Sequence, residues 1–372
     1  MIRKCSGNLP TLLWNLVGLN LQLLTSLTKK NAITVFMSLH VINRYARQGR
    51  SNMLTTNDFK KKQLLFVSLN QGEKLSFSND NIVIRDVNNK IKHQSTCYRL
   101  FAVFVIGNLS ITTGLIQRAR RFNFSIVLMT PTYRVYQIIG GPKEGNTVLR
   151  RNQYNYAGIE LAKQITGNKI LNQQNLLKKN RKKTDSVHEA ISALSIYING
   201  VENASSLEEI MGFEGSASRI YFKNHFNNID WKGRKPRVKH DMANALLDIG
   251  YTMLFNYIDA ILNIYGFDTY CGVMHKDFYM RKSLVCDLVE PFRYLIDDQV
   301  KKSFNLGQWK EKDFDIRNNC YILQWKNNAE YVSILMQPIM EKRDDIFLYL
   351  QSYYRAFMKN LPAEQFPVFQ EI

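Results

Sequence analysis

The period of the hydrophobic pattern changes once along this chain, and that change limits the possible fold more than any other feature. Between Gln63 and Gly141 the apolar residues form short runs rich in β-branched and aromatic side chains, separated by asparagine and glycine, as strands and turns require. After about Asn146 the apolar residues recur every three to four positions, which is the period of helices. The sequence therefore predicts an α+β protein in which a β-rich domain precedes an α-helical domain.

These runs also predict individual elements and a domain boundary. Gly140–Pro142 is a typical chain breaker, so we expect a β-rich domain at residues 53–145 and an α-helical domain at residues 146–372. In the first domain the predicted strands are Leu64–Leu69, Lys74–Phe77, Ile82–Arg85, Leu100–Ile106, Ser125–Met129 and Tyr133–Ile139, with one helix at Thr113–Phe122. In the second domain the predicted helices are Ile159–Leu177, Val187–Ile198, Met242–Tyr265 and Ile346–Met358.

Residues 1–52 fit neither domain. No charged residue occurs between Cys5 and Thr28, as in a signal peptide or a membrane anchor. However, polar residues recur near helical spacing opposite the leucines, whereas a spanning helix would be apolar all round, and no clear cleavage site is present. We interpret residues 1–52 as an atypical N-terminal extension, with Met53 near the start of the first domain. A membrane anchor is the alternative.

The charge balance indicates the kind of partner. The chain has 50 basic and 31 acidic residues and a net charge of +19, with an apolar content of 45% that is sufficient for a folded core. A basic folded protein favours a polyanion, most simply nucleic acid. Two basic segments, Lys178–Lys183 and Trp231–Lys239, are expected to be loops that either face DNA or are merely solvated. Five widely spaced cysteines without a C-x-x-C pair argue against a disulfide framework or a cysteine zinc site.

One constellation of residues suggests chemistry. Glu214 lies among small residues that allow close backbone approach, and His275 follows further along the chain. Asp287 and Glu290 are three residues apart and therefore neighbours on one helical face. Carboxylates with one imidazole suit Mg²⁺ or Mn²⁺, and such an ion suits phosphodiester chemistry; surface acids and a structural histidine would give the same spacing. The basic residues expected to surround such an ion and bind DNA phosphates are Arg219, Lys276, Arg281, Lys282 and Arg293.

Four segments around these residues resemble the CRISPR-associated adaptation integrase and endonuclease, the Cas-one family, in its order and at its spacing. The resemblance runs from about Met53 to the C-terminus, and it departs from the family motif Glu-Gly-x-Ala-Ala-Arg at Ser218. Arg281–Asp287 and Lys302–Gln308 further resemble members of type V single-effector systems. The four segments are Gly212–Phe222, Asp241–Tyr251, Gly272–Lys276 and Ser283–Arg293.

The resemblance implies a site and a reaction. It makes Glu214, His275 and Glu290 the catalytic residues and the ligands of Mg²⁺ or Mn²⁺, with Asp287 as the neighbouring acid. The implied reaction is attack by the 3′-hydroxyl of a captured DNA duplex on a phosphodiester at the leader–repeat junction, which inserts a spacer into a CRISPR array.

The resemblance also implies partners and a location. The expected protein is a homodimer that binds the protospacer duplex, the CRISPR repeat, a small ferredoxin-like Cas subunit and a Cas exonuclease that trims ends. The expected location is the cytoplasm of a prokaryote, without membrane association.

Two other functions are compatible with parts of this pattern. A transposon integrase of the casposase type would carry an added helix-turn-helix domain, whereas the 79 residues that follow Arg293 resemble catalytic-domain helices. A non-catalytic DNA-binding subunit would have no need of a complete acid–histidine–acid set.

Overall fold

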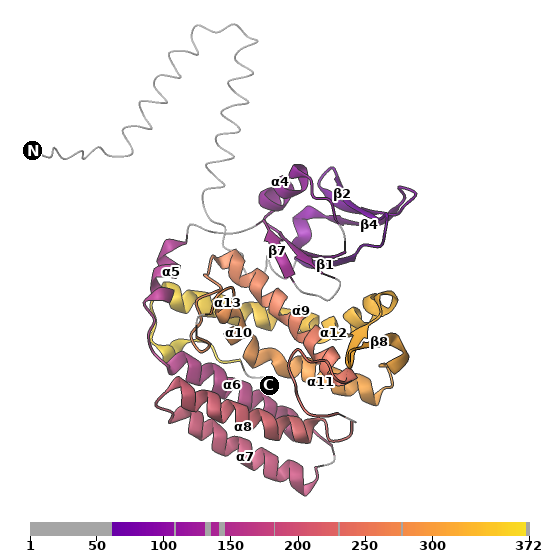
Figure 1. Cartoon of the computed structure of the whole chain (residues 1–372). Coiled ribbons are helices and arrows are strands. Elements are labelled where there is room, and N and C mark those ends of the chain that lie inside the picture. Colours follow the sequence, from indigo (N-terminus) through magenta and orange to yellow (C-terminus); the bar gives the residue numbers. More distant parts are fainter. Residues whose placement is uncertain are drawn as a thin grey trace, which may run out of the picture. The chain divides into compact units, whose positions relative to one another are not determined.

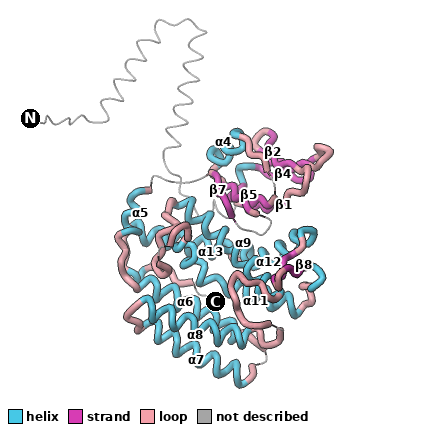
Figure 2. The backbone as a smooth tube through the Cα atoms, in the orientation of Figure 1, coloured by secondary structure: helices cyan, strands magenta, loops and turns pink. Residues whose placement is uncertain are grey.

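The computed structural model has the predicted order of a β-rich part followed by a helical part (Figures 1 and 2). The fold class is therefore confirmed. The predicted N-terminal extension, residues 1–52, and the proposed domain start at Met53 lie outside the described residues. The residues described are 62–107, 109–130, 135–140, 146–181, 183–229, 231–276 and 278–369.

The larger sheet of the β-rich part has the strand order β1-β5-β6-β7. Strands β1, β5 and β6 run parallel, and β7 pairs with β6 in the antiparallel direction. Strands β5 and β6 are buried along their whole length, which explains why their sequences are continuous apolar runs. The bounds are β1 Gln63–Ser68, β5 Leu100–Ile106, β6 Ser125–Met129 and β7 Val135–Ile139.

The smaller sheet is an antiparallel meander of β2, β3 and β4. Strand β4 was not predicted, because four of its six residues are exposed and its sequence has no apolar run. The predicted helix α4 is confirmed; the Thr112 side chain caps its start and Asn123, in the left-handed region, ends it. The bounds are β2 Lys74–Ser78, β3 Asn81–Arg85, β4 Ile91–Thr96 and α4 Thr113–Phe122.

The helical part begins at α5, after β7 has ended at Ile139. The predicted domain ranges stay predictions, although the change of element type falls where they place it. Helices α6, α7 and α8 pack against one another (Figure 1). The bounds are α5 Thr147–Tyr154, α6 Glu160–Lys178, α7 Asp185–Glu202, α8 Leu207–His225, α9 Met242–Tyr265, α10 Ser283–Val289, α11 Arg293–Asn305, α12 Asn328–Glu341 and α13 Arg343–Met358.

Helix α9 is the central helix of the core. Among the described residues it is long and apolar enough to cross a membrane, but 83% of its most apolar window is buried inside the fold, as expected for a core helix. Asp241 accepts a hydrogen bond from the backbone N–H of Asn244 at its start, and Gly266, with φ 84°, ends it. Both are preferred capping residues, so the sequence predicted the bounds of this helix correctly.

One prediction for the helical part is wrong. The residues after Arg293 were expected to be helical, but β8 (Phe314–Arg317) and β9 (Cys320–Leu323) form an antiparallel hairpin. Its turn residues, Asn318 and Asn319, have φ of 51° and 59°. Asparagine tolerates this left-handed conformation, which a tight two-residue hairpin turn requires.

Candidate active site

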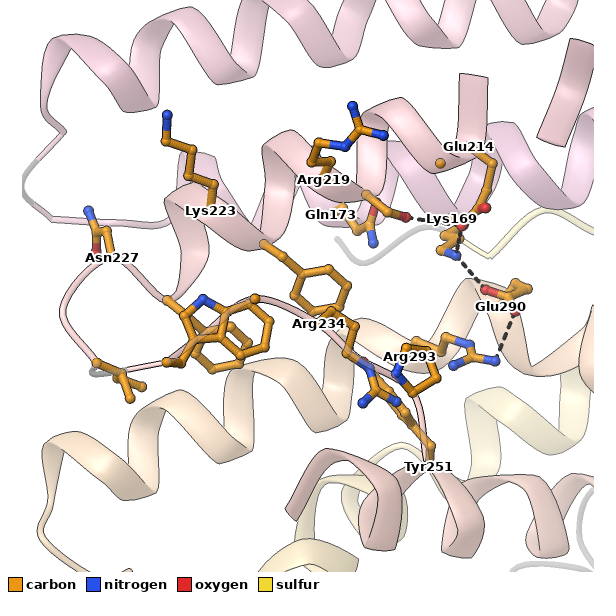
Figure 3. A pocket seen from close by; sticks show the side chains of 18 residues that line it. Lys169, Gln173, Glu214, Arg219, Lys223, Asn227, Arg234, Tyr251, Glu290 and Arg293 are labelled. Atoms are coloured by element: carbon orange, nitrogen blue, oxygen red, sulfur yellow. Dashed lines mark hydrogen bonds and ion pairs between the residues drawn. The ribbon is translucent and has the colours of Figure 1, made fainter. Parts of the chain in front are cut away.

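Three elements bring the two predicted glutamates together. Glu214 lies in the middle of α8, and Glu290 begins a single 3₁₀ turn (Glu290–Phe292) between α10 and α11. Helix α6 lies beside both, since Asn172 of α6 donates a hydrogen bond to the carbonyl of Pro291 at 2.9 Å. The α6 residue nearest to the acids is Lys169 (Figure 3).

Lys169 contacts both carboxylates. Its Nζ bonds to Oε1 of Glu214 and lies 2.7 Å from Oε2 of Glu290. Arg293 Nη2 lies 3.0 Å from the other oxygen of Glu290, and Ser218 donates a hydrogen bond to Glu214 at 3.0 Å. The side chains of Lys169 and Glu290 are 10% and 6% exposed. Two acids that are distant in sequence therefore share one buried ammonium, and we call these three residues the acid cluster.

Glu290 and Lys169 both stay charged at neutral pH. Burial alone would raise the pKa of Glu290, but the Arg293 and Lys169 cations lower it to about 2. Burial also disfavours the charged form of Lys169, but the carboxylates of Glu290 and Glu214 outweigh it and raise the pKa of the ammonium. A buried ion pair of this kind needs good geometry and further polar contacts to offset its desolvation. Ser218 supplies a hydrogen bond to Glu214, and Arg293 supplies a second cation to Glu290.

Asp287 contacts a different region, the loop that carries His275. This fully buried carboxylate accepts hydrogen bonds from the backbone N–H groups of Val273, Met274 and His275 at 2.6, 3.1 and 3.0 Å. Its Oδ1 also lies 2.6 Å from Nδ1 of His275. A Cβ at Gly272 would come within 2.8 Å of Asp287 Oδ2, so the close approach requires glycine. We call Gly272–Lys276 the histidine loop.

Asp287 and Glu290 were predicted to be neighbours on one helical face, but their carboxylates do not act on the same group. Helix α10 ends at Val289, and the two carboxylates bond to different groups. The carboxylate of Asp287 fixes Nδ1 of His275, which leaves Nε2 as the ring nitrogen available to a ligand. A carboxylate that bonds to the other ring nitrogen in this way commonly orients a metal-binding histidine.

Glu214, Glu290 and His275 carry the kinds of ligand atom that bind a divalent cation. Among the described residues, no three histidine, cysteine, aspartate or glutamate side chains are arranged to hold a metal ion. Glu214 and Glu290 nevertheless already share one cation, the Lys169 ammonium, which stands in for an ion between them. Carboxylate oxygens and one imidazole nitrogen are suitable ligands for Mg²⁺ or Mn²⁺.

The acid cluster lines a cavity of about 800 Å³ that extends between α8 and the basic loop Trp231–Lys239 (Figure 3). Part of its lining is aromatic, because the rings of Phe222, Phe226 and Trp231 pack together. Basic side chains also line it; these are Arg219, Lys223, Arg234 and Arg293. A polyanion with planar groups is the kind of ligand that this combination fits.

The predicted DNA-binding residues separate into two groups. Arg219 and Arg293 line the cavity. Lys276 pairs with the exposed Glu208 of α8 at 2.7 Å, and Lys282 pairs with the buried Asp259 of α9 at 2.7 Å. Arg281 lies beside the thiol of Cys286. Burial raises the pKa of this thiol, and the contact with Arg281 partly offsets that rise. His275 and Asp287 are not among the described residues that line the cavity.

Lys169 and Arg234 are among the cavity residues that were not predicted individually from the sequence. Lys169 belongs to a set of polar residues on the buried face of α6, and that placement is the signal that could have identified it. Arg234 lies in a segment predicted as a basic loop. It bonds to Asn244 at 3.0 Å and to Asp248 at 2.7 Å, which ties that loop to the start of α9.

Comparison with known proteins gives a consistent result. Residues 66–335 match the family model described as CRISPR associated protein Cas1. The chain is 29% identical over 256 residues to CRISPR-associated endonuclease Cas1 1 of Thermodesulfovibrio yellowstonii, covering 65% of this chain and 80% of that protein. It is 31% identical over 277 residues to CRISPR-associated endonuclease Cas1 1 of Chlorobaculum tepidum, covering 69% and 80%.

Solved structures share the fold at low sequence identity. A casposase bound to integration product has a TM-score of 0.69 at 19% identity, covering 83% of this chain and 94% of that one. A CAS1 protein from Thermotoga maritima has a TM-score of 0.67 at 19% identity, covering 79% and 97%. A chain of a Cas6-RT-Cas1–Cas2 complex has a TM-score of 0.71 at 23% identity, and the match covers 84% of this chain but only 36% of that one.

Proposed function

Because this chain belongs to the Cas1 family of CRISPR-associated proteins, we propose that it is a metal-dependent DNA integrase and endonuclease that inserts captured DNA into a CRISPR array. One observation carries the proposal: Glu214 and Glu290 share a single cation position in a cavity lined with arginine and lysine. A site of two carboxylates and a divalent ion, surrounded by phosphate-binding charge, suits phosphodiester chemistry.

Each residue would have a distinct role. Glu214, Glu290 and Nε2 of His275 would hold Mg²⁺ or Mn²⁺. When bound, the ion polarises the scissile phosphate and stabilises the charge that develops on it. Asp287 would orient His275, because it bonds to Nδ1 and to the backbone of the histidine loop. Arg219 would hold the DNA backbone, which positions the substrate without reading its sequence.

The reaction exchanges one phosphodiester for another. The 3′-hydroxyl oxygen of the captured duplex forms a bond to the phosphorus at the leader–repeat junction. The bond from that phosphorus to the 3′-oxygen of the leader breaks, and the released oxygen takes up a proton while the attacking hydroxyl loses one. Since one ester bond replaces another, the reaction needs no external energy source.

The partners follow from this proposal. We expect the protospacer duplex and the CRISPR repeat as DNA partners, a homodimer, a small ferredoxin-like Cas subunit, and a Cas exonuclease that trims ends. Support comes from neighbours in fold, which include a chain of a Cas6-RT-Cas1–Cas2 complex and a casposase bound to integration product. Assignment to a type V system rests on Arg281–Asp287 and Lys302–Gln308 alone. The proposed location is the prokaryotic cytoplasm, without membrane association.

A casposase-type transposon integrase is the second candidate, and the likeness in fold to a casposase favours it. Both candidates perform strand transfer, so the target DNA separates them: the proposed function requires a CRISPR repeat in the target. A non-catalytic DNA-binding subunit would perform no strand transfer with either target.

Strand transfer in vitro tests the proposal. A labelled duplex with free 3′-hydroxyls is incubated with a repeat-bearing plasmid and either Mn²⁺ or a chelator, and a duplex with blocked 3′ ends serves as the control. We expect joined product only with Mn²⁺ and free 3′ ends, and more product with the repeat than without it. Equal product in the chelator would contradict the metal-dependent reaction.

A further inference from the structure

Lys169 lies at the place where the proposed function puts a divalent ion. We propose that Lys169 is a built-in counter-ion that holds Glu214 and Glu290 together before the metal arrives and then competes with the metal for the same two carboxylates. The inference rests on the proposed function, because it takes both glutamates as metal ligands. It adds a residue that controls how tightly the site binds its ion.

The contacts make Lys169 the link between the two acids. Glu214 is part of α8 and Glu290 starts a turn between α10 and α11, so neither element fixes the other acid directly. The Lys169 ammonium contacts both carboxylates, and only 10% of the Lys169 side chain is exposed. Without a cation between them, two nearby carboxylates would repel each other, and Glu290 would be a buried charge with Arg293 as its remaining ionic partner.

Lysine is suited to leave this position, whereas Arg293 is held in place. A lysine ammonium is a compact charge on a flexible four-carbon stem, and the cavity of about 800 Å³ lies directly beside Lys169. The guanidinium of Arg293 is fixed on two sides, since Nη2 lies 3.0 Å from Glu290 and Cζ lies 4.7 Å from the centroid of the Tyr251 ring. An incoming divalent cation would repel the Lys169 ammonium toward the cavity. There the ammonium would be free to pair with a DNA phosphate.

Metal affinity measured without DNA tests the competition. Mn²⁺ binding is followed by isothermal titration calorimetry at one fixed pH for wild type, Lys169→Met and Lys169→Arg. Lys163→Met is the matched control, because Lys163 lies on the same helix and pairs with Glu160 at 3.2 Å, away from the acid cluster. We expect Lys169→Met to bind Mn²⁺ about tenfold more tightly, since one close like charge is removed. Lys169→Arg and Lys163→Met should not gain affinity, and wild-type or weaker affinity of Lys169→Met would overturn the inference.

A second measurement uses the wild-type protein and does not depend on how well a variant folds. An amine-reactive acylating reagent labels lysines in the presence of chelator or of saturating Mn²⁺, and mass spectrometry of the peptides gives the rate at each site. Lys169 should be protected in chelator and labelled several-fold faster with Mn²⁺, while labelling of Lys163 stays constant. If Mn²⁺ binds without changing the labelling rate of Lys169, the ammonium does not leave the carboxylates and the inference fails.

The outcomes also separate this inference from the proposed function. If wild type integrates DNA with Mn²⁺ but Lys169→Met binds Mn²⁺ no more tightly, the competition fails and the integrase function stands. If wild type neither binds Mn²⁺ nor transfers strands, both are overturned.

Discussion

The acid cluster and the histidine loop use two acids from the same short stretch of sequence in opposite ways. Asp287, which bonds to the histidine loop, is fully buried, and its partners are three backbone N–H groups and one imidazole. Glu290 of the acid cluster bonds to two cations beside a cavity. The partners of Asp287 are part of the fold and cannot leave, whereas an ammonium on a flexible stem can be exchanged for another cation.

Under the proposed function, this difference separates an acid that positions a histidine from an acid that would bind the metal ion. Both are ionisable residues at low exposure, so burial and residue type alone do not distinguish them. What distinguishes them is the nature of their hydrogen-bond and ionic partners. Substitutions at the two positions should therefore fail in different ways: one should remove activity from a folded protein, and the other should weaken the fold as well.

The largest expected effect is on activity, at the acid cluster. Glu290→Gln and Glu214→Gln should each reduce strand transfer by at least about a thousandfold, because several kcal/mol of transition-state stabilisation depend on the bound ion. Both variants should stay folded, since Lys169 keeps one carboxylate partner in each. The measurement is the initial rate of strand transfer with Mn²⁺, with circular dichroism to verify folding. A folded variant that integrates at the wild-type rate would remove that glutamate from the site.

The next effect is on stability, at the histidine loop. Asp287→Asn should lower the free energy of unfolding by about 3 kcal/mol, because a neutral amide cannot satisfy the buried N–H donors that the carboxylate accepts. Strand transfer should fall too, as His275 loses its fixed orientation. Urea unfolding measures the first effect. Glu189→Gln, at an exposed position of α7, is the control and should change stability by less than about 0.5 kcal/mol. Equal stability of Asp287→Asn and wild type would show that the histidine loop does not depend on this carboxylate.

A smaller effect on the free energy of unfolding depends on pH and comes from the buried His225. Burial, assisted by the Lys301 charge, lowers the pKa of His225 from 6.5 to about 3. The folded protein therefore keeps His225 neutral while the unfolded chain takes up a proton, so stability present above pH 6.5 is lost as the pH falls toward 3. Between pH 7.5 and pH 5 this loss amounts to about 2 kcal/mol.

The variant His225→Phe measures that contribution. It keeps an aromatic ring at a position where His225 stacks on Tyr221 at 5.1 Å, but it cannot take up a proton. Urea unfolding at pH 7.5 and pH 5 should show that the variant loses about 2 kcal/mol less than wild type on acidification. The same acid loss in both proteins would mean that other groups account for it.

The elements that the sequence predicted well are those whose signals are local. Helix α9 has a capping residue at each end, Asp241 and Gly266, and its predicted bounds are those of the structure. Strand β4 was missed because its exposed polar residues carry no hydrophobic pattern. The hairpin β8–β9 did carry a signal, the turn pair Asn318 and Asn319, but the helical period of the surrounding residues concealed it.

In the candidate site too, the features with local sequence signals were predicted and those that depend on distant contacts were not. Glu214 and Glu290 are recognisable from the motifs around them, and the structure brings their side chains to one cation. Lys169 lies 45 residues before Glu214 in the chain, and only the packing of α6 against α8 gives it a role. The spacing of Asp287 and Glu290 did not show which groups each carboxylate bonds to, because that depends on where α10 ends and which groups face each carboxylate.

Crystals of the wild-type protein grown with Mn²⁺ would show directly whether Glu214, Glu290 and His275 form one metal site that Lys169 vacates, through anomalous scattering at the manganese edge. We expect an anomalous peak bound by Glu214, Glu290 and Nε2 of His275, with the Lys169 ammonium displaced from both carboxylates. A manganese ion bound elsewhere, with Lys169 still bridging the two glutamates, would contradict this expectation.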